Sequence, residues 1–149
     1  MPRVTRTRTV EASLADVWKL VSDPYNLPRW WPRTSRVENV VGEGGRRTRW
    51  TKVLETAEGR GVRADFRCLS SAEGERYVWE QELGGTPFER HLKDLRVEVG
   101  LREQNGGTAV SLTEEQSLKG MSKLGSPLMR RARGDVLDEA LDGIERALG

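Results

Sequence analysis

Three polar side chains stand on strand faces that are otherwise apolar. Gln81, Glu114 and Gln116 each alternate in step with apolar neighbours, so we expect all three to point towards an apolar interior. Burial favours the protonated form of a lone carboxylate, and Glu114 could then serve as a general acid or base, or bind a ligand hydroxyl. The alternative is that Glu114 lies in water at the strand end or pairs with an arginine. The two glutamines could orient a ligand or make ordinary structural hydrogen bonds.

Few other side chains could do chemistry. Tyr77 is a second candidate catalytic residue, able to donate a proton or a hydrogen bond, although a tyrosine on a strand surface is the simpler interpretation. With His91 as the single histidine and Cys68 as the single cysteine, we expect neither a metal site of the zinc type nor a disulfide. The chain also has no glycine-rich motif for dinucleotides or phosphates.

Tryptophan dominates the aromatic residues, with five tryptophans beside two tyrosines and two phenylalanines. Trp30 and Trp31 stand together between Pro28 and Pro32, where either ring could stack on a flat ligand or simply pack in the core. Large rings on several elements build a dense core or the wall of an apolar pocket, and we favour the pocket. Its expected wall consists of Trp30, Trp31, Trp50, Phe66, Trp79, Gln81, Val97, Leu112, Gln116, Met121, Leu128, Met129 and Ala132.

The elements that must position these residues follow from periodicity and turn signals. Residues 3–10 alternate as a strand, Ser13 begins a helix with Asp16 as its capping-box partner, and residues 25–31 form a short second helix. Ser126 and Pro127 begin a last amphipathic helix of about 20 residues. Between them, glycine-rich turns separate six further predicted strands, near residues 35–42, 46–56, 61–70, 76–84, 92–103 and 108–118.

This order predicts an α+β fold, with a curved antiparallel sheet of about seven strands wrapped around one long helix. Because a helix is only about 10–12 Å wide, it is too narrow to fill such a sheet, and a cavity should remain. Alternation places Arg63 and Arg67 on the outer face unless a β-bulge reverses the strand. The strand of Trp50 is ambiguous, because Trp50 shares its face with Lys52 while Val53 lies on the other.

Composition limits the partners. The 25 basic and 23 acidic residues give a net charge of +2, but they are interleaved, as where Arg130, Arg131 and Arg133 precede Asp135. We interpret them as a mixed-charge surface rather than a nucleic-acid site. The chain has neither a signal-peptide core nor an apolar run long enough to span a membrane, so we expect one cytoplasmic domain, residues 1–149, without stable membrane insertion. The sequence leaves a homodimer open.

The chain resembles the START-like (SRPBCC) superfamily, in its polyketide cyclase/dehydrase and lipid-transport branch. The resemblance depends on the ordered segments Val10–Asp23, Leu27–Trp30, Gly84–Phe88 and Gly106–Thr108, followed by the closing helix. It implies a helix-grip, Bet v 1-like fold whose deep cavity takes an apolar or aromatic ligand, with no metal or organic cofactor. Catalytic members often use an inward arginine and a tyrosine in the cavity.

Two main functions remain open. The first is a carrier or sensor that binds a small apolar or aromatic molecule, polyketide-like or lipid-like. The alternative is a cofactor-free polyketide cyclase or dehydratase that uses Glu114, Tyr77 or an arginine, although the outward parity of Arg63 and Arg67 departs from the catalytic pattern. Polar residues deep in the cavity would favour the enzyme, and a filled interior would favour a third function, an interaction module.

Overall fold

The computed structural model describes residues 3–42, 45–55, 61–86, 92–118 and 126–149. For residues 55, 92–93, 118 and 126–129 it describes the backbone alone. Among the residues considered above, His91 and Met121 lie outside the described part of the chain, and the side chains of Leu128 and Met129 are likewise outside it.

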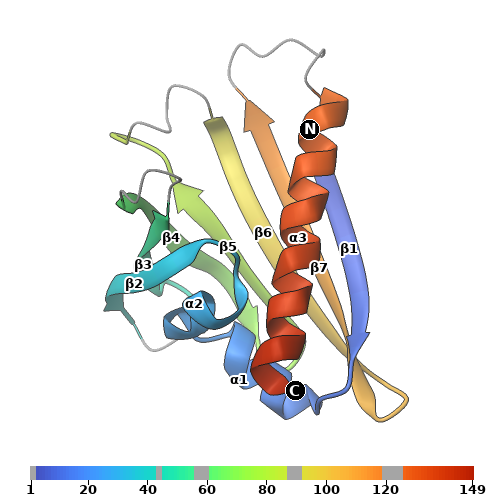
Figure 1. The fold of residues 1–149 in the computed structure, drawn as a ribbon. Coiled ribbons are helices and arrows are strands. Elements are labelled where there is room, and N and C mark those ends of the chain that lie inside the picture. The colour runs from blue at the N-terminus through green and yellow to red at the C-terminus, as the bar shows by residue number, and fades with distance from the viewer. Residues whose placement is uncertain (1–2, 43–44, 56–60, 87–91, 119–125) are drawn as a thin grey trace.

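The described residues form one antiparallel sheet and one long helix (Figure 1). In chain order the elements are β1 (Arg3–Val10), α1 (Leu14–Val21), the 3-10 turn η1 (Pro24–Asn26), α2 (Leu27–Trp30), β2 (Thr34–Val41), β3 (Arg49–Glu55), β4 (Gly61–Ala72), β5 (Arg76–Glu82), β6 (Leu92–Gln104), β7 (Gly107–Leu118) and α3 (Ser126–Leu148). The described strands make a seven-stranded sheet in the order β1-β7-β6-β5-β4-β3-β2. The predicted α+β fold is therefore confirmed.

Local sequence explains where the first helix begins. The Ser13 hydroxyl accepts a hydrogen bond from the backbone N–H of Asp16 at 3.1 Å, which satisfies one of the unpaired donors of the first turn. In the same way, the Asp23 carboxylate accepts the N–H of Tyr25 at 3.0 Å at the start of η1. These caps direct the chain from the edge strand β1 back across the sheet, where α1 and α2 lie (Figure 1).

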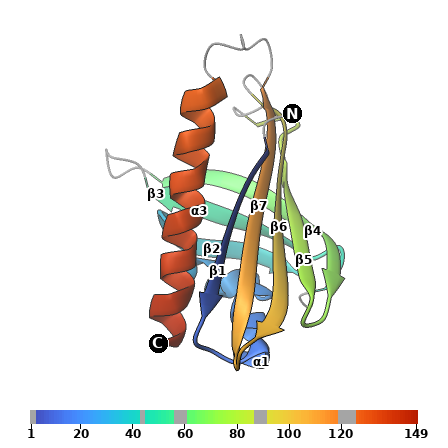
Figure 2. The same cartoon turned by 90° about the vertical axis from the view of Figure 1, so that its right-hand side faces the viewer.

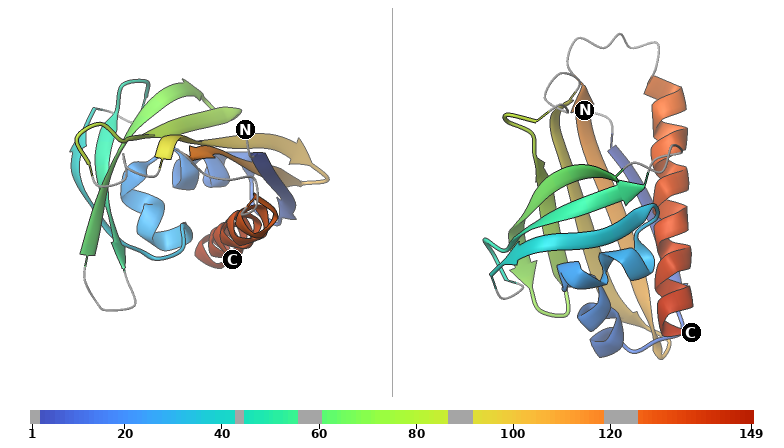
Figure 3. Two further views of the ribbon diagram at one scale, coloured as in Figure 1. Left: turned by 90° about the horizontal axis from the view of Figure 1, so that it is seen from above. Right: turned by 60° about the vertical axis from the view of Figure 1, so that its left-hand side comes forward.

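The sheet bends around α3, so that β2, β3 and β4 cross over the end of the groove that α2 occupies (Figures 2 and 3). The C-terminal half of α3 is packed into the sheet, since Leu137, Leu141 and Ile144 are all fully buried. Here α3 also approaches α2 closely: a Cβ at Gly143 would lie only 2.2 Å from the Trp30 carbonyl oxygen. Among the described residues, the groove is thus filled beside the second half of the helix, and a cavity lies beside Arg133 and Val136 of the first half.

Strand pairing shows which side chains of β3 and β4 point into the interior, which the sequence left ambiguous. Trp50 pairs with Phe66 and Lys52 with Ala64, and since paired residues share a face, Lys52 points to the interior. Arg63 and Arg67 point outwards and bind Glu38 and Glu80. The irregularity in β4 falls between Cys68 and Ser70, beyond both arginines, so it does not turn them inwards. No helix in the described residues is long and apolar enough to cross a membrane.

Candidate functional site

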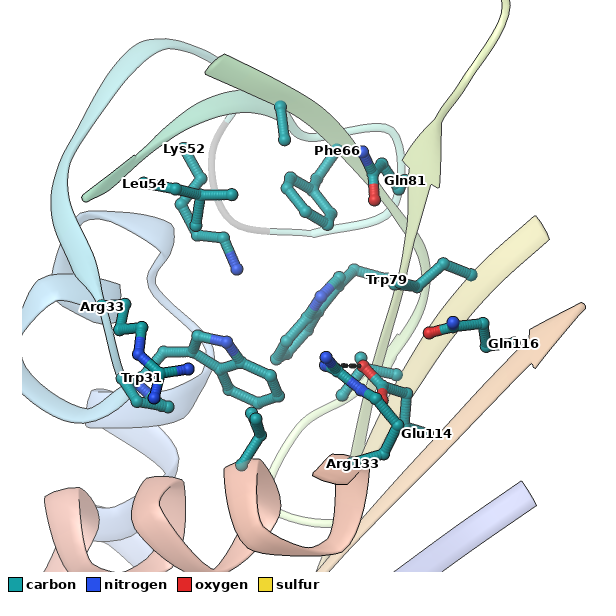
Figure 4. Close-up of a pocket in the computed structure, with 15 residues that line it drawn as sticks. Trp31, Arg33, Lys52, Leu54, Phe66, Trp79, Gln81, Glu114, Gln116 and Arg133 are labelled. Atoms are coloured by element: carbon teal, nitrogen blue, oxygen red, sulfur yellow. Dashed lines mark hydrogen bonds and ion pairs between the residues drawn. The ribbon is translucent and has the colours of Figure 1, made fainter. Parts of the chain in front are cut away.

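A cavity of about 340 Å³ lies between the sheet and the first half of α3 (Figure 4). Strands β3 to β7 supply most of its wall, and the residues that follow α2 supply another side. The residues that line it are Trp31, Pro32, Arg33, Lys52, Leu54, Ala64, Phe66, Trp79, Gln81, Leu95, Val97, Glu114, Gln116, Arg133 and Val136. Its volume is at the lower end of the range usual for sites that hold small organic molecules.

Aromatic rings form one part of the wall. Trp31 and Trp79 meet edge to face, with centroids 5.7 Å apart and planes at 74°. Behind this lining, Trp30 packs edge to face on both tryptophans, and Trp50 stacks on Phe66 at 6.2 Å. Because the second layer is itself aromatic and buried, the rings at the cavity are held in fixed orientations.

Opposite these rings, Glu114 of β7 and Arg133 of α3 form a two-point ion pair (Figure 4). The guanidinium Nη2 donates to Oε1 of Glu114 at 2.7 Å, and Nε donates to Oε2. The carboxylate is almost fully buried, whereas 31% of the Arg133 side chain remains exposed. Glu114 is therefore not the lone carboxylate that its sequence setting first predicted; the alternative of an arginine partner is what the structure contains.

Lys52 is the least expected group in the cavity. Its Nζ points into the open space between two rings, 5.1 Å from the centroid of Trp31 and 4.8 Å from that of Phe66 (Figure 4). The residue is only 6% exposed, and within the described part of the chain no hydrogen bond or ion pair holds its Nζ. The charged form of Lys52 is therefore stabilised by cation–π contacts with these two rings.

Burial controls the charge of this amine. Loss of hydration lowers the pKa of Lys52 from 10.5 to about 7; the carboxylate of Glu114 opposes the change and the guanidinium of Arg133 adds to it. A substantial fraction of Lys52 is therefore a neutral amine at neutral pH. Neutral lysine is a nucleophile and a base, whereas an ordinary surface lysine at the same pH is almost entirely ammonium.

Two amides complete the polar part of the wall. Gln81 of β5 and Gln116 of β7 both line the cavity and are largely buried. The Nε2 of Gln81 is buried without a hydrogen-bond partner among the described residues. An unsatisfied buried donor beside an apolar cavity provides a hydrogen bond for an acceptor on a ligand.

The structure brings some of the expected pocket residues to the cavity and places the others elsewhere. Those that do line the cavity are Trp31, Phe66, Trp79, Gln81, Val97, Glu114 and Gln116. Trp30 and Trp50 are packed behind the lining, and Leu112 lies in the filled part of the groove, since each is at most 2% exposed and makes core contacts instead. Ala132 is exposed, because α3 turns that position away from the sheet.

Tyr77 also lies away from the cavity. Its ring is 1% exposed and packs against Trp18 at 6.1 Å and Trp79 at 6.1 Å. Burial raises the pKa of the Tyr77 phenol far above its ordinary value, so the group stays protonated. The expectation that Tyr77 acts on a ligand in this cavity is therefore wrong: the parity was right, but the ring faces the filled part of the groove.

Sequence reasoning missed three charged residues of the wall: Arg33, Lys52 and Arg133. Lys52 carried a usable signal, because it shares a strand face with Trp50. Arg133 carried none, since it stands among other charges in a segment that we interpreted as solvated surface. Among the described lining residues Glu114 is the one acidic group, so this part of the wall has an excess of basic groups. Among the described residues, no cluster of His, Cys, Asp or Glu side chains could hold a metal ion.

Sequence comparison identifies the family. The profile described as "Polyketide cyclase / dehydrase and lipid transport" matches residues 1–149. The chain belongs to this family. Its members form part of the START-like (SRPBCC) superfamily, which agrees with the resemblance in the sequence. No curated protein sequence matches the chain significantly.

Solved structures confirm the fold of this family member. A START superfamily protein from Mycobacterium smegmatis is 16% identical, with a TM-score of 0.76 over 98% of this chain and 96% of that one. The protein Ara h 8.0201 is 20% identical, with a TM-score of 0.76 and the same coverage. The di-domain ARO/CYC BexL from the BE-7585A biosynthetic pathway is 20% identical, with a TM-score of 0.78 over 99% of this chain and 46% of that one. At these identities the likeness concerns the fold alone.

Proposed function

We propose that the protein binds a small aromatic molecule carrying oxygen substituents, as a carrier or sensor, in the cavity between the sheet and α3. One observation carries this proposal: a cavity of about 340 Å³ lies beside a densely packed core of buried aromatic residues. Protein interiors ordinarily close such space, because each unfilled volume loses dispersion contacts. A cavity kept open by a double layer of rings favours a flat guest.

The chemistry of the wall narrows the guest. Trp31, Phe66 and Trp79 offer ring faces and edges, while Gln81 offers an unsatisfied donor. Within the described wall, Lys52, Arg33 and Arg133 outnumber the one carboxylate, that of Glu114. A purely hydrocarbon ligand would leave the Gln81 Nε2 and the Lys52 amine unpaired at a cost of about 1–3 kcal/mol each, so a guest with carbonyl, phenol or carboxylate oxygens fits better.

A cofactor-free polyketide cyclase or dehydratase is the second candidate. It is favoured by the polar groups inside the cavity, where Lys52 could remove a proton alpha to a carbonyl and Gln81 could stabilise the resulting enolate oxygen. Two solved structures of similar fold are di-domain ARO/CYC proteins from biosynthetic pathways, which supports this candidate. Glu114 is less suited to be the base, because Arg133 already occupies both of its oxygens.

Titration with 2-naphthol, followed by tryptophan fluorescence, tests the binding proposal. We expect saturable quenching, because the ligand would lie against Trp31 and Trp79. The variant Ala64→Leu adds bulk to the cavity wall and should weaken binding at least tenfold, whereas Ala132→Leu, on the exposed side of α3, should not change it. Both variants should unfold cooperatively in urea. Equal affinities for the two variants, or no quenching by the wild type, would contradict the proposal.

The catalytic alternative needs a separate assay. An aryl β-diketone that cyclises by aldol closure and dehydration would gain a new aromatic absorption band. If the protein is an enzyme, Lys52→Met should abolish that band, whereas Ala132→Leu, on the exposed side of α3, should keep it. Binding without any turnover by the wild type would leave the carrier or sensor function.

A further inference from the structure

We infer that Lys52 is a covalent binding site, whose side-chain amine forms an imine with an aldehyde or ketone carried by an aromatic guest. This inference deepens the proposed function and rests on the cavity being a binding site. It assigns a reactive role to Lys52 and names the class of ligand: an aromatic molecule with a carbonyl group next to the ring.

Geometry supplies the first support. Nζ stands in the cavity between the rings of Trp31 and Phe66, about 5 Å from each centroid (Figure 4). A flat ligand that stacks along either ring therefore brings its substituent to the amine. No described residue ties Nζ down by a hydrogen bond or ion pair, so its lone pair is available once the proton has left.

The surroundings of the amine supply the second support. Among the described residues, the charged groups that act on it are Glu114 of β7 and Arg133 of α3; Arg33, which follows α2, lines the same cavity but is exposed. Arg133 engages both oxygens of Glu114, which prevents the carboxylate from holding Lys52 as a charged ion-pair partner. Desolvation therefore dominates and brings the pKa of Lys52 to about 7. Amines activated in this way are the ones that form Schiff bases with carbonyl compounds.

The reaction needs no other reagent. The Nζ lone pair forms a bond to the carbonyl carbon, the C=O π pair moves to oxygen, and one amine proton moves to that oxygen to give a carbinolamine. The hydroxyl then leaves as water with the second amine proton, and a C=N bond remains. Gln81 lines the same cavity, and its unpaired Nε2 could donate to the oxygen while the charge develops.

Reductive trapping tests the inference. The folded protein is incubated at pH 7 with 2-naphthaldehyde and sodium cyanoborohydride, which reduces an imine to a stable secondary amine. Mass spectrometry should find one adduct, with the mass of the aldehyde less one oxygen atom, and peptide mapping should place it on Lys52. At pH 7 only about one in three thousand molecules of an ordinary lysine is neutral, so labelling of Lys52 should exceed that of the exposed Lys19 at least tenfold.

Two variants and one ligand make the test decisive. Lys52→Arg keeps a cation and Lys52→Met keeps the side-chain length, and both should lose the adduct while still unfolding cooperatively in urea. Binding of 2-naphthol, which has no carbonyl group, is measured on the wild type. If the wild type binds 2-naphthol but 2-naphthaldehyde labels no lysine, or labels Lys19 as much as Lys52, the inference is wrong and the binding proposal stands. If neither compound quenches the tryptophans and no adduct forms, both fail.

Discussion

Replacing Lys52 with methionine should stabilise the unliganded protein, and the gain should disappear as the pH rises. In the fold, burial among Trp31, Phe66 and the rest of the cavity wall lowers the pKa of Lys52 to about 7, against 10.5 for a hydrated lysine. Below pH 7 the folded state must either hold an ammonium in a poorly hydrated site or give up a proton. At about 1.4 kcal/mol per pH unit, this difference costs the fold at most roughly 5 kcal/mol.

The sign follows from proton counting. Between pH 7 and 10.5 the unfolded chain keeps the Lys52 proton and the folded chain has lost it, so the free energy of unfolding rises with pH. Methionine fills the same space without a charge, so it adds no pH dependence to the free energy of unfolding. The advantage of Lys52→Met over the wild type should therefore be largest near pH 6, at about 3–5 kcal/mol, and should shrink by about 2 kcal/mol between pH 6 and 8.5.

Urea unfolding followed by far-ultraviolet circular dichroism, at half-unit steps from pH 6 to 8.5, measures this difference. Stopping at pH 8.5 limits the contributions of Cys68 and Tyr77, whose pKa values burial raises, and both variants share those contributions. Lys19→Met, on the exposed face of α1, is the matched control and should show no pH-dependent difference from the wild type. A constant difference across this range, or a destabilised Lys52→Met at pH 6, would refute the reasoning.

Two further predictions concern stability. Arg133→Met should lower the free energy of unfolding by about 2–3 kcal/mol, because it leaves the buried Glu114 carboxylate without a partner, whereas Glu114→Gln should lower it by about 1 kcal/mol, because the exposed part of Arg133 reaches water. The double variant should lose less than the sum of the two, and additive losses in urea unfolding would count against the pairing. Gly143→Ala should destabilise the protein by about 1–3 kcal/mol, because the added methyl group clashes with the Trp30 carbonyl. Gly134→Ala meets only the flexible guanidinium of Arg6 and should be neutral or up to about 1 kcal/mol stabilising. Equal thermal midpoints for the two variants would contradict the close approach of α2 and α3.

Much of the fold was predictable because it depends on local patterns. Ser13 and Ser126 stand before amphipathic runs, and the observed helices begin at Leu14 and Ser126. Period-two alternation fixed the inward faces of β4, β5, β6 and β7, and with them the positions of Phe66, Trp79 and Glu114. In these strands each apolar residue has one favourable side, so sequence alone decides which way it points.

The cavity itself was predictable only in outline. Because a helix is narrower than the sheet that curves around it, the sequence predicts that some space stays open. Which half of the groove stays open depends on the approach of α2 to Gly143 and on the packing of Leu137, Leu141 and Ile144. For this reason Tyr77 and Leu112, which have the correct parity, lie in the filled half, while Val97 and Gln116 line the open one. Parity states which face a residue occupies and not its height along the groove.

The amino-acid sequence by itself determined the elements, their order and the faces of most strands, since these depend on neighbours a few positions apart. Only the tertiary structure shows which charged groups lie in the interior: Glu114 forms an ion pair with Arg133, and Lys52 points into a cavity rather than into water. Buried charges are stable only when groups from distant segments of the chain contact them. Here those contacts depend on how β3, β7 and α3 pack together.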